Sequence, residues 1–170
     1  MTEREDQFEA LFAAHHEKVL AFFLRRTDQP ADAADLVGET FLIAWRRMEE
    51  VRDRAELWLF GVARRVLANH RRGRSRQTHL ADRLREALHS SPPAVEESIG
   101  LVAAELARLS PSDRELLTLT AWEGLRPADL AVVLGTSEVT ARVRLHRARN
   151  RLRARLEAEA LVPGALSASP

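Results

Sequence analysis

The segment EGLRPADLAVVLGTSEVTARVRLHRARNRLRARL, residues 123–156, decides the fold expected for the C-terminal part of the chain. Pro127 suits the first position of a helix, where its missing N–H is not needed. Gly135 suits the left-handed residue that ends this helix, and Thr136 or Ser137 can cap the next helix by accepting from its free N–H groups. The segment therefore predicts two helices joined by a tight turn, the second long and basic.

The second helix is expected to have an apolar face and an arginine face. In a helix-turn-helix, the start of the second helix enters the DNA major groove, and arginine suits both guanine edges and phosphates. The alternative is a solvated arginine face, which is disfavoured because a basic run without acids repels itself. The apolar stripe is Ala141, Leu145, Ala148, Leu152 and Leu156, and the arginines are Arg142, Arg144, Arg147, Arg149, Arg151, Arg153 and Arg155.

The formal net charge of the 170-residue chain is only +1, but the charges are unevenly distributed. Residues 64–76 and 142–155 are basic, whereas residues 28–39 are acidic, which suggests more than one partner. The absence of cysteine excludes disulfides, thiolate catalysis and cysteine zinc sites. Because the sequence shows neither a membrane span nor a signal peptide, the expected location is the cytoplasm.

Apolar spacing predicts three helices in the first half of the chain, at about residues 5–26, 31–48 and 56–72. In the second helix, Asp32, Asp35 and Glu39 are three and four residues apart and share a face. These carboxylates either form a divalent-cation site or favour the helix dipole. Gly38 among them costs the helix about 1 kcal/mol relative to alanine.

One aromatic and two histidine side chains in these helices are candidates for a functional role. Trp58, near the start of the basic third helix, either stacks on a nucleic-acid base or lies in the core. His15 and His16 are expected to be structural or surface residues, because a metal site needs further ligands in register.

DLVGETFLIAWRR (35–47), a charged loop, WLFGVARRVLANHRR (58–72) and the helix-turn-helix occur in this order. Together they resemble a bacterial RNA polymerase sigma factor of the sigma-70 family, in the extracytoplasmic-function (ECF) group. The resemblance implies an all-α protein without enzymatic activity or cofactor, made of two small helical domains joined by a flexible linker. The expected parts are region 2 at residues 1–76, the linker at 77–93, region 4 at 94–160 and a loose tail at 161–170.

The resemblance also implies partners. The first is core RNA polymerase, which the protein would bind at the β′ clamp helices and the β flap. The others are promoter DNA and an anti-sigma factor that holds the protein inactive. Gly38 stands where the family usually has glutamine. The residues that match the polymerase-binding segment are Asp32, Asp35, Leu36, Val37, Glu39, Thr40, Phe41 and Trp45.

Two further residue sets correspond to the family's promoter-reading elements. In the minus-ten set, Arg65 stands where asparagine is common; in the minus-thirty-five set, Val139 replaces a glycine and Val143 a serine. The minus-ten set, which would hold a flipped base, is Arg52, Arg54, Trp58, Arg64, Arg65, Asn69, Arg71 and Arg72. The minus-thirty-five set is Ser137, Glu138, Thr140, Arg142, Val143, Arg144, His146, Arg147 and Arg149.

Other functions explain less of the sequence. A stand-alone helix-turn-helix regulator accounts for the last third of the chain and leaves the acidic residues 28–39 without a role. A protein-binding helical module leaves the arginine helix unexplained. An enzyme is least supported, because no nucleophile–base pair, phosphate loop or metal constellation emerges.

Overall fold

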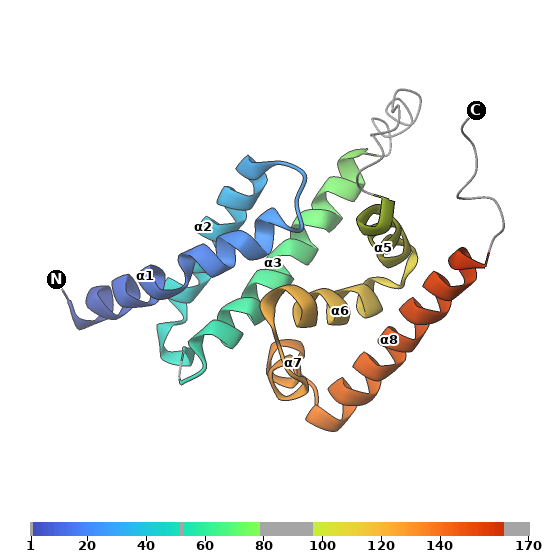
Figure 1. The fold of residues 1–170 in the computed structure, drawn as a ribbon. Helices are drawn as coiled ribbons and strands as arrows, with labels where there is room; N and C mark the ends of the chain where they lie inside the picture. Colours follow the sequence, from blue (N-terminus) through green and yellow to red (C-terminus); the bar gives the residue numbers. More distant parts are fainter. Residues whose placement is uncertain (1, 52, 79–96, 162–170) are drawn as a thin grey trace. The chain divides into compact units, whose positions relative to one another are not determined.

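Every regular element that the computed structural model describes, in residues 2–51, 53–78 and 97–161, is helical, which confirms the all-α expectation (Figure 1). The elements are α1 (Glu3–Leu24), α2 (Pro30–Arg46), the 3₁₀ turn η1 (Met48–Glu50), α3 (Ala55–Thr78), α5 (Glu97–Arg108), α6 (Pro111–Glu123), α7 (Pro127–Leu134) and α8 (Glu138–Ala160).

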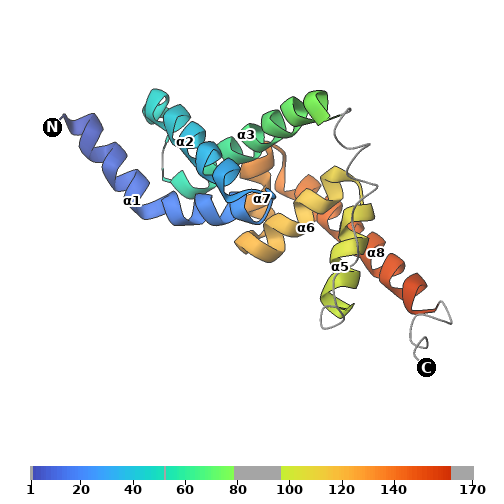
Figure 2. The same cartoon turned by 90° about the horizontal axis from the view of Figure 1, so that it is seen from above.

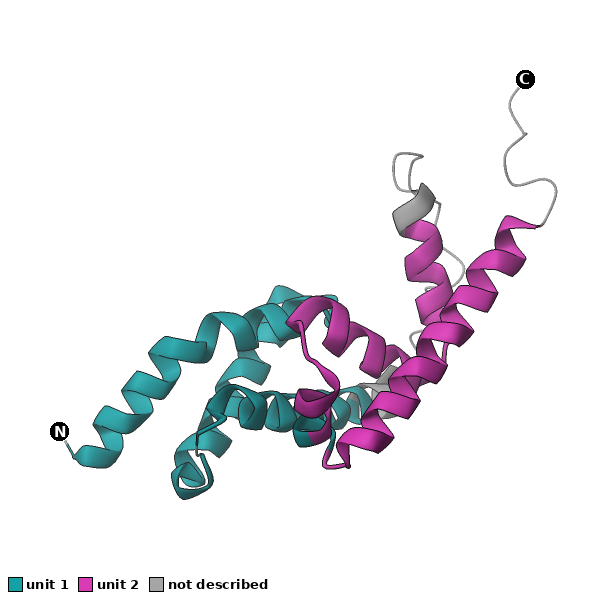
Figure 3. Cartoon of the chain, turned by 60° about the horizontal axis from the view of Figure 1, so that its bottom comes forward, with its two compact units in different colours: residues 1–89, 132–134 teal, residues 90–131, 135–170 magenta. Residues whose placement is uncertain are grey.

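The chain divides into two compact units (Figure 3). Unit 1 comprises residues 1–89 with 132–134, and unit 2 comprises residues 90–131 with 135–170. Most of the expected linker and nearly all of the expected tail lie outside the described residues.

In unit 1, α1, α2 and α3 pack against one another, as Figures 1 and 2 both show. Its core is rich in rings: the Phe22 ring centroid lies 5.3 Å from that of Phe23, edge to face, and 5.7 Å from that of Phe60. Such aromatic pairs stabilise a core beyond the area they bury. The other buried apolar side chains of α1 to α3 are Leu11, Val19, Ala33, Leu36, Phe41, Ala44, Leu57, Leu59, Val62, Ala63, Val66 and Leu67.

A second group of rings joins α1 to α2. The Phe12 and Phe41 ring centroids are 4.7 Å apart, and those of Phe8 and Trp45 are 5.3 Å apart, both edge to face. The Arg4 guanidinium lies 4.9 Å from the Trp45 ring centroid and donates a hydrogen bond to the Trp45 carbonyl oxygen at 2.5 Å. The two helices are thus joined by rings and a cation–π contact.

Two helix ends in unit 1 differ from the sequence prediction. α1 begins earlier than expected because Thr2 and Glu5 form a capping box, each side chain bonding the other's backbone N–H. α3 continues beyond Arg72 to Thr78, passing through Gly73. The positive-φ glycines of the described residues are Gly124 and Gly135, so Gly73 does not end the helix.

In unit 2, α5 and α6 pack against α8. Ala141, Leu145 and Ala148 of the expected apolar stripe are buried, whereas Leu152 and Leu156 are half-buried, so the stripe is less covered near the C-terminal end of α8. The remaining buried apolar side chains of this unit are Leu109, Leu116, Leu117, Leu119, Leu125 and Leu130.

The helix-turn-helix forms as the positions of its proline, glycine and serine predict. α7 begins at Pro127, Gly135 has φ 64°, and the Ser137 side chain accepts from the Thr140 N–H at 3.1 Å. Ser137 is thus the cap, rather than Thr136. Trp122, at the end of α6, is 44% exposed and does not belong to the core of this unit.

Candidate nucleic-acid interface

The first turns of α8 present most of the predicted minus-thirty-five residues to solvent. Ser137 already has a structural task as the cap of α8, and Arg142 forms an ion pair with Glu138 at 2.5 Å. Arg144 is half-buried and donates to the Ser112 Oγ at 2.5 Å. The other exposed members of the set are Thr140, Val143, His146, Arg147 and Arg149.

Two arginines farther along α8 bind acids of neighbouring helices. The Arg151 Nη1 lies 3.0 and 2.8 Å from the two carboxylate oxygens of Asp113. The Arg155 Nε donates to the buried Glu105 at 2.7 Å, and Arg108 donates to the other oxygen of Glu105. These bonds connect α8 to both α6 and α5.

The sequence pattern does not predict that the buried acids Asp113 and Glu105 pair with arginines of α8. Asp113 stands in the capping-box position relative to Ser110, but only the Ser110 side chain bonds the backbone, and the Asp113 carboxylate binds Arg151 instead. For Glu105, burial by itself raises the carboxyl pKa, but the hydrogen bonds and charges of Arg155 and Arg108 outweigh burial and hold the pKa below its ordinary value.

Apart from Arg142, which pairs with Glu138 of its own helix, the arginines of α8 fall into two groups. Arg144, Arg151 and Arg155 bond α6 and α5, so part of the self-repulsion expected for this helix is relieved within the protein. Within the described ranges, Arg147, Arg149 and Arg153 have no hydrogen bond or ion pair to another side chain. These three remain available for an anionic partner.

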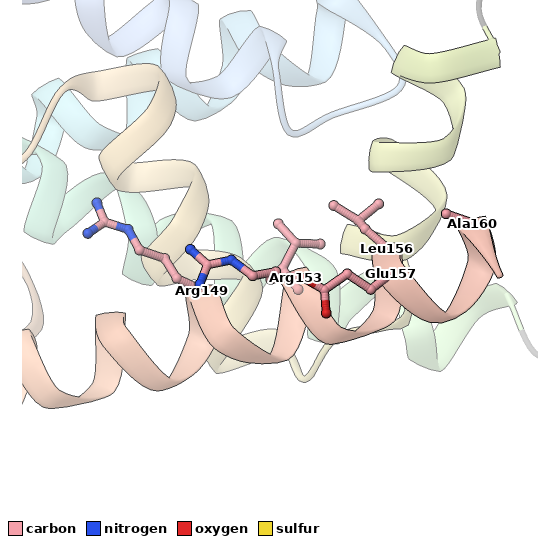
Figure 4. A pocket seen from close by; sticks show the side chains of 6 residues that line it. Arg149, Arg153, Leu156, Glu157 and Ala160 are labelled. Atoms are coloured by element: carbon pink, nitrogen blue, oxygen red, sulfur yellow. The ribbon is translucent and has the colours of Figure 1, made fainter.

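A hollow of about 490 Å³ lies along the C-terminal half of α8 (Figure 4). The half-buried Leu152 and Leu156 give it apolar walls, and Arg149, Arg153 and Glu157 line it with charge. Two of the available arginines, Arg149 and Arg153, line it, and of its lining residues the predicted minus-thirty-five set included only Arg149.

In α3, several predicted minus-ten residues share one face. Trp58, Arg65, Asn69 and Arg72 are separated by seven, four and three residues, which places them along one stripe of a helix. Arg65 donates to its own helix at the Gly61 carbonyl at 2.9 Å. These four positions thus follow one another along a single face of α3.

The other predicted minus-ten residues lie beside this stripe or outside the described part of the chain. Arg64 is half-buried, and Arg71 is exposed and donates to the Arg26 carbonyl oxygen at 3.2 Å. Arg54 is exposed just before α3, and Arg52 lies outside the described residues. Trp58 is half-buried, so its ring is neither fully packed nor fully free.

The predicted polymerase-binding residues divide into an exposed and a covered set. Asp35 and Glu39 are exposed on α2, and a side chain added at Gly38 between them would meet no other atom within 4 Å of its Cβ. Leu42, which sequence reasoning missed, is 47% exposed on the same face. The signal for Leu42 was its spacing of seven and three residues from the two acids.

The covered set of α2 serves the core of unit 1. Leu36, Thr40 and Phe41 are buried, and the Thr40 hydroxyl donates to the Leu36 carbonyl at 2.8 Å. Val37 and Trp45 are half-buried, and so is Asp32, whose Oδ2 lies 3.7 Å from the His70 Nε2 of α3. The buried residues of this set pack α2 against the core of unit 1, and only the exposed set can contact a partner.

The histidines of α1 have structural surroundings. His16 stacks on Phe12 with ring centroids 5.0 Å apart. The His15 Nδ1 lies 4.0 Å from Glu56, which also pairs with Lys18 at 2.5 Å. Burial lowers the pKa of His15, Glu56 partly offsets this effect, and Lys18 adds to it. Across residues 2–51, 53–78 and 97–161, no three acidic or histidine side chains gather as a metal site would require.

Comparison with known proteins finds two family models along the chain. Residues 11–77 match sigma-70 region 2, and residues 99–152 match sigma-70 region 4. In the described part of the chain, no helix combines the length and apolarity needed to cross a membrane.

Two curated relatives match this chain over most of their own length. The ECF RNA polymerase sigma factor SigL of Mycobacterium tuberculosis is 33% identical, with 87% of this chain and 88% of the relative covered. The RNA polymerase sigma-E factor of Streptomyces coelicolor is 31% identical, with 94% and 92% covered.

Solved structures share the fold. The sigma factor RpoE of Bartonella quintana, solved with the anti-sigma factor NepR, has a TM-score of 0.62 at 24% identity and covers 89% of this chain and 98% of its own. CnrH, solved with the cytosolic domain of CnrY, has a TM-score of 0.60 at 27% identity and covers 89% and 88%.

Proposed function

The chain belongs to the sigma-70 family of RNA polymerase sigma factors, in the ECF group, and from that premise we propose that it binds core RNA polymerase and directs it to a specific set of promoters. The observation that carries this proposal is the pair of matches, region 2 followed by region 4, on one chain. A regulator that used only the helix-turn-helix would leave the region 2 match without a role. The proposed domains are residues 1–76 and 94–160, joined by a linker at 77–93.

We assign the β′ clamp helices of polymerase to the exposed face of α2. Asp35, Glu39 and Leu42 give this face two negative charges and one apolar side chain. Gly38 between them leaves room for a partner's side chain to approach the helix backbone. The buried Leu36, Thr40 and Phe41 hold this face in place from below.

The minus-ten element is assigned to α3. Arg65, Asn69 and Arg72 lie along one stripe of the helix and can follow a single DNA strand through phosphate contacts and hydrogen bonds. The half-buried Trp58 on the same stripe can offer part of its ring to an unstacked base.

The minus-thirty-five element is assigned to the exposed start of α8. Arg147 is the strongest candidate for base contact, because it is exposed, lies in the N-terminal half of α8 and has no intramolecular partner in the described residues. Arg149 is available for phosphate contacts, whereas Arg144 already bonds α6.

Because the proposed partners are core RNA polymerase and promoter DNA, we propose that the protein acts in the cytoplasm. An anti-sigma factor is the further partner that we propose. Both solved relatives are complexes with a protein partner. The hollow beside Leu152 and Leu156, with arginines along it, offers a surface for an amphipathic acidic segment such as the β flap or an inhibitor could supply.

Co-elution of the full chain with bacterial core RNA polymerase on a sizing column tests the proposal. Stoichiometric binding is expected for the wild type, and weaker binding for Asp35→Asn with Glu39→Gln. The matched control is Glu9→Gln with Glu17→Gln, which removes two exposed carboxylates from α1. Wild-type protein that is folded and fails to bind cognate core polymerase would contradict the proposal, and equal loss in both double variants would remove the assignment of the α2 face.

A further inference from the structure

Two valines stand exposed on the first turns of α8. Val139 is 68% exposed and Val143 is 42% exposed, and a spacing of four residues places them on the same face. β-branched residues are weaker helix formers than most, and Val139 buries little of its surface in return, while Val143 is only partly covered. Helix propensity therefore does not explain why valine occupies both positions.

The surroundings of the two valines are polar and cationic. The Glu138–Arg142 ion pair lies on the same turns, and Arg147 follows Val143 by four residues. The result is a stripe in which two apolar side chains precede an arginine that has no ion pair in the described residues.

A duplex DNA major groove offers one apolar group on its base edges, the C5 methyl of thymine. Small apolar side chains on a recognition helix contact this methyl, while arginine takes guanine or phosphate. We propose that Val139 and Val143 read thymine by packing against C5 methyl groups in the minus-thirty-five element, an inference that rests on the function proposed above.

The helix geometry limits where these thymines lie. Residues four apart are separated by about 6 Å along a helix, at 1.5 Å per residue. Base pairs stack about 3.4 Å apart, so the two thymines, on either strand, are within about two base-pair steps of each other.

The test removes the methyl and nothing else. Holoenzyme reconstituted from the full chain and core polymerase selects minus-thirty-five sequences from a randomised promoter library. Each thymine of the selected element is then replaced singly by uracil, on either strand, and holoenzyme binding is measured. Wild-type holoenzyme is expected to bind about fourfold more weakly at one or two neighbouring positions, the loss that corresponds to one buried methyl-sized group.

Variants assign each methyl to its valine. Val139→Ser and Val143→Ser should each abolish the uracil penalty at one position, as a double-mutant cycle requires. Val102→Ser is the matched control, because Val102 is also an exposed valine of unit 2 and lies on α5; this variant should keep both penalties. Circular dichroism verifies that all three variants are folded.

The outcomes separate this inference from the proposed function. A holoenzyme that selects no minus-thirty-five sequence would count against the proposed function itself. A selected element without thymine on either strand, or one in which uracil binds as well as thymine everywhere, would overturn the valine inference and leave the proposed function standing. Uracil penalties that persist unchanged in both serine variants would overturn it as well.

Discussion

Unit 1 and unit 2 are stabilised by different interactions. In unit 1, rings dominate: Phe22, Phe23 and Phe60 pack in the core, and further rings join α1 to α2. In unit 2 the core is aliphatic, and buried acids hold α8 through Arg151 and Arg155. Arginine therefore serves two purposes in α8: Arg144, Arg151 and Arg155 bond neighbouring helices. Arg147, Arg149 and Arg153 are available for DNA. Among the described side chains of unit 1, no charged residue of α2 or α3 is buried in the core.

The largest expected effect is in the aromatic core. Phe22→Ala should lower the free energy of unfolding of unit 1 by about 3–5 kcal/mol, because it removes a fully buried ring and leaves a cavity. The measurement is urea unfolding of the full chain carrying Trp122→Phe, so that Trp45 and Trp58 alone report. The loss should not depend on salt. A loss below about 1 kcal/mol would show that the rings are not the main support.

Replacing an available arginine should weaken DNA binding and leave the free energy of unfolding unchanged. Arg147→Ala is expected to cost about 1–3 kcal/mol in promoter binding and to relax sequence preference at one position, if this residue reads a base. Equal loss on all DNA sequences would make Arg147 a phosphate contact instead. A fall in unfolding free energy would contradict its placement in the available group.

Breaking the Asp113–Arg151 ion pair, which joins α8 to α6, should instead lower the stability of unit 2. Asp113→Asn is expected to lower the stability of unit 2 by about 1–2 kcal/mol, a figure reduced because the Arg151 side chain is 58% exposed. Urea unfolding followed by Trp122 fluorescence, in a chain that carries Trp45→Phe and Trp58→Phe so that Trp122 alone reports, measures this loss. The difference in stability between Asp113→Asn and the parent chain should shrink at high salt, because salt screens the ion pair in the parent chain. Unchanged stability would mean that α8 does not need this brace.

A smaller effect is expected at Gly38. Gly38→Ala should raise the stability of unit 1 by about 1 kcal/mol, since a Cβ there meets nothing and alanine favours the helix. Gly73→Ala, also exposed and without neighbours, is the matched control and should give a similar gain. Thermal unfolding by circular dichroism compares them. A loss with Gly38→Ala alone would reveal a backbone constraint at that position.

Acid should destabilise the two units in different pH windows. The folded pKa of His15 lies below its ordinary value of 6.5, so its contribution to unit 1 is present above that value and is lost as pH falls through the folded pKa. The folded pKa of Glu105 lies below 4.5, so the corresponding loss in unit 2 begins only below that pH. Urea midpoints measured against pH should lose the first effect with His15→Gln and the second with Glu105→Gln. A single shared window would contradict this assignment.

The helices and the central turn could be predicted from local patterns. Pro127, Gly135 and Ser137 act through backbone conformation and capping, which depend on neighbours in sequence, and apolar spacing located the buried side of α8 as far as Ala148. The C-terminal end of α3 was predicted less well. Apolar spacing placed it near residue 72, whereas the helix continues to Thr78, because Gly73 keeps a helical backbone.

The candidate site was less predictable, because it depends on which faces meet. Arg155 and Glu105 are 50 positions apart, and no local sequence pattern predicts that they pair. Asp113 matched a capping pattern, yet a long-range arginine gave it a better partner. On α2, the motif marked Phe41 and Asp35 alike, and only the packing shows that one is buried and the other exposed.

The most direct test of the central claim is run-off transcription. The full chain and core RNA polymerase are combined on a library of promoter fragments, with core polymerase alone and Arg147→Ala holoenzyme run in parallel. We expect transcripts from defined start sites with the wild type, none with core alone, and fewer or redistributed starts with Arg147→Ala. Transcription that is the same with and without the chain, while the chain is folded and bound to polymerase, would contradict its role as a sigma factor.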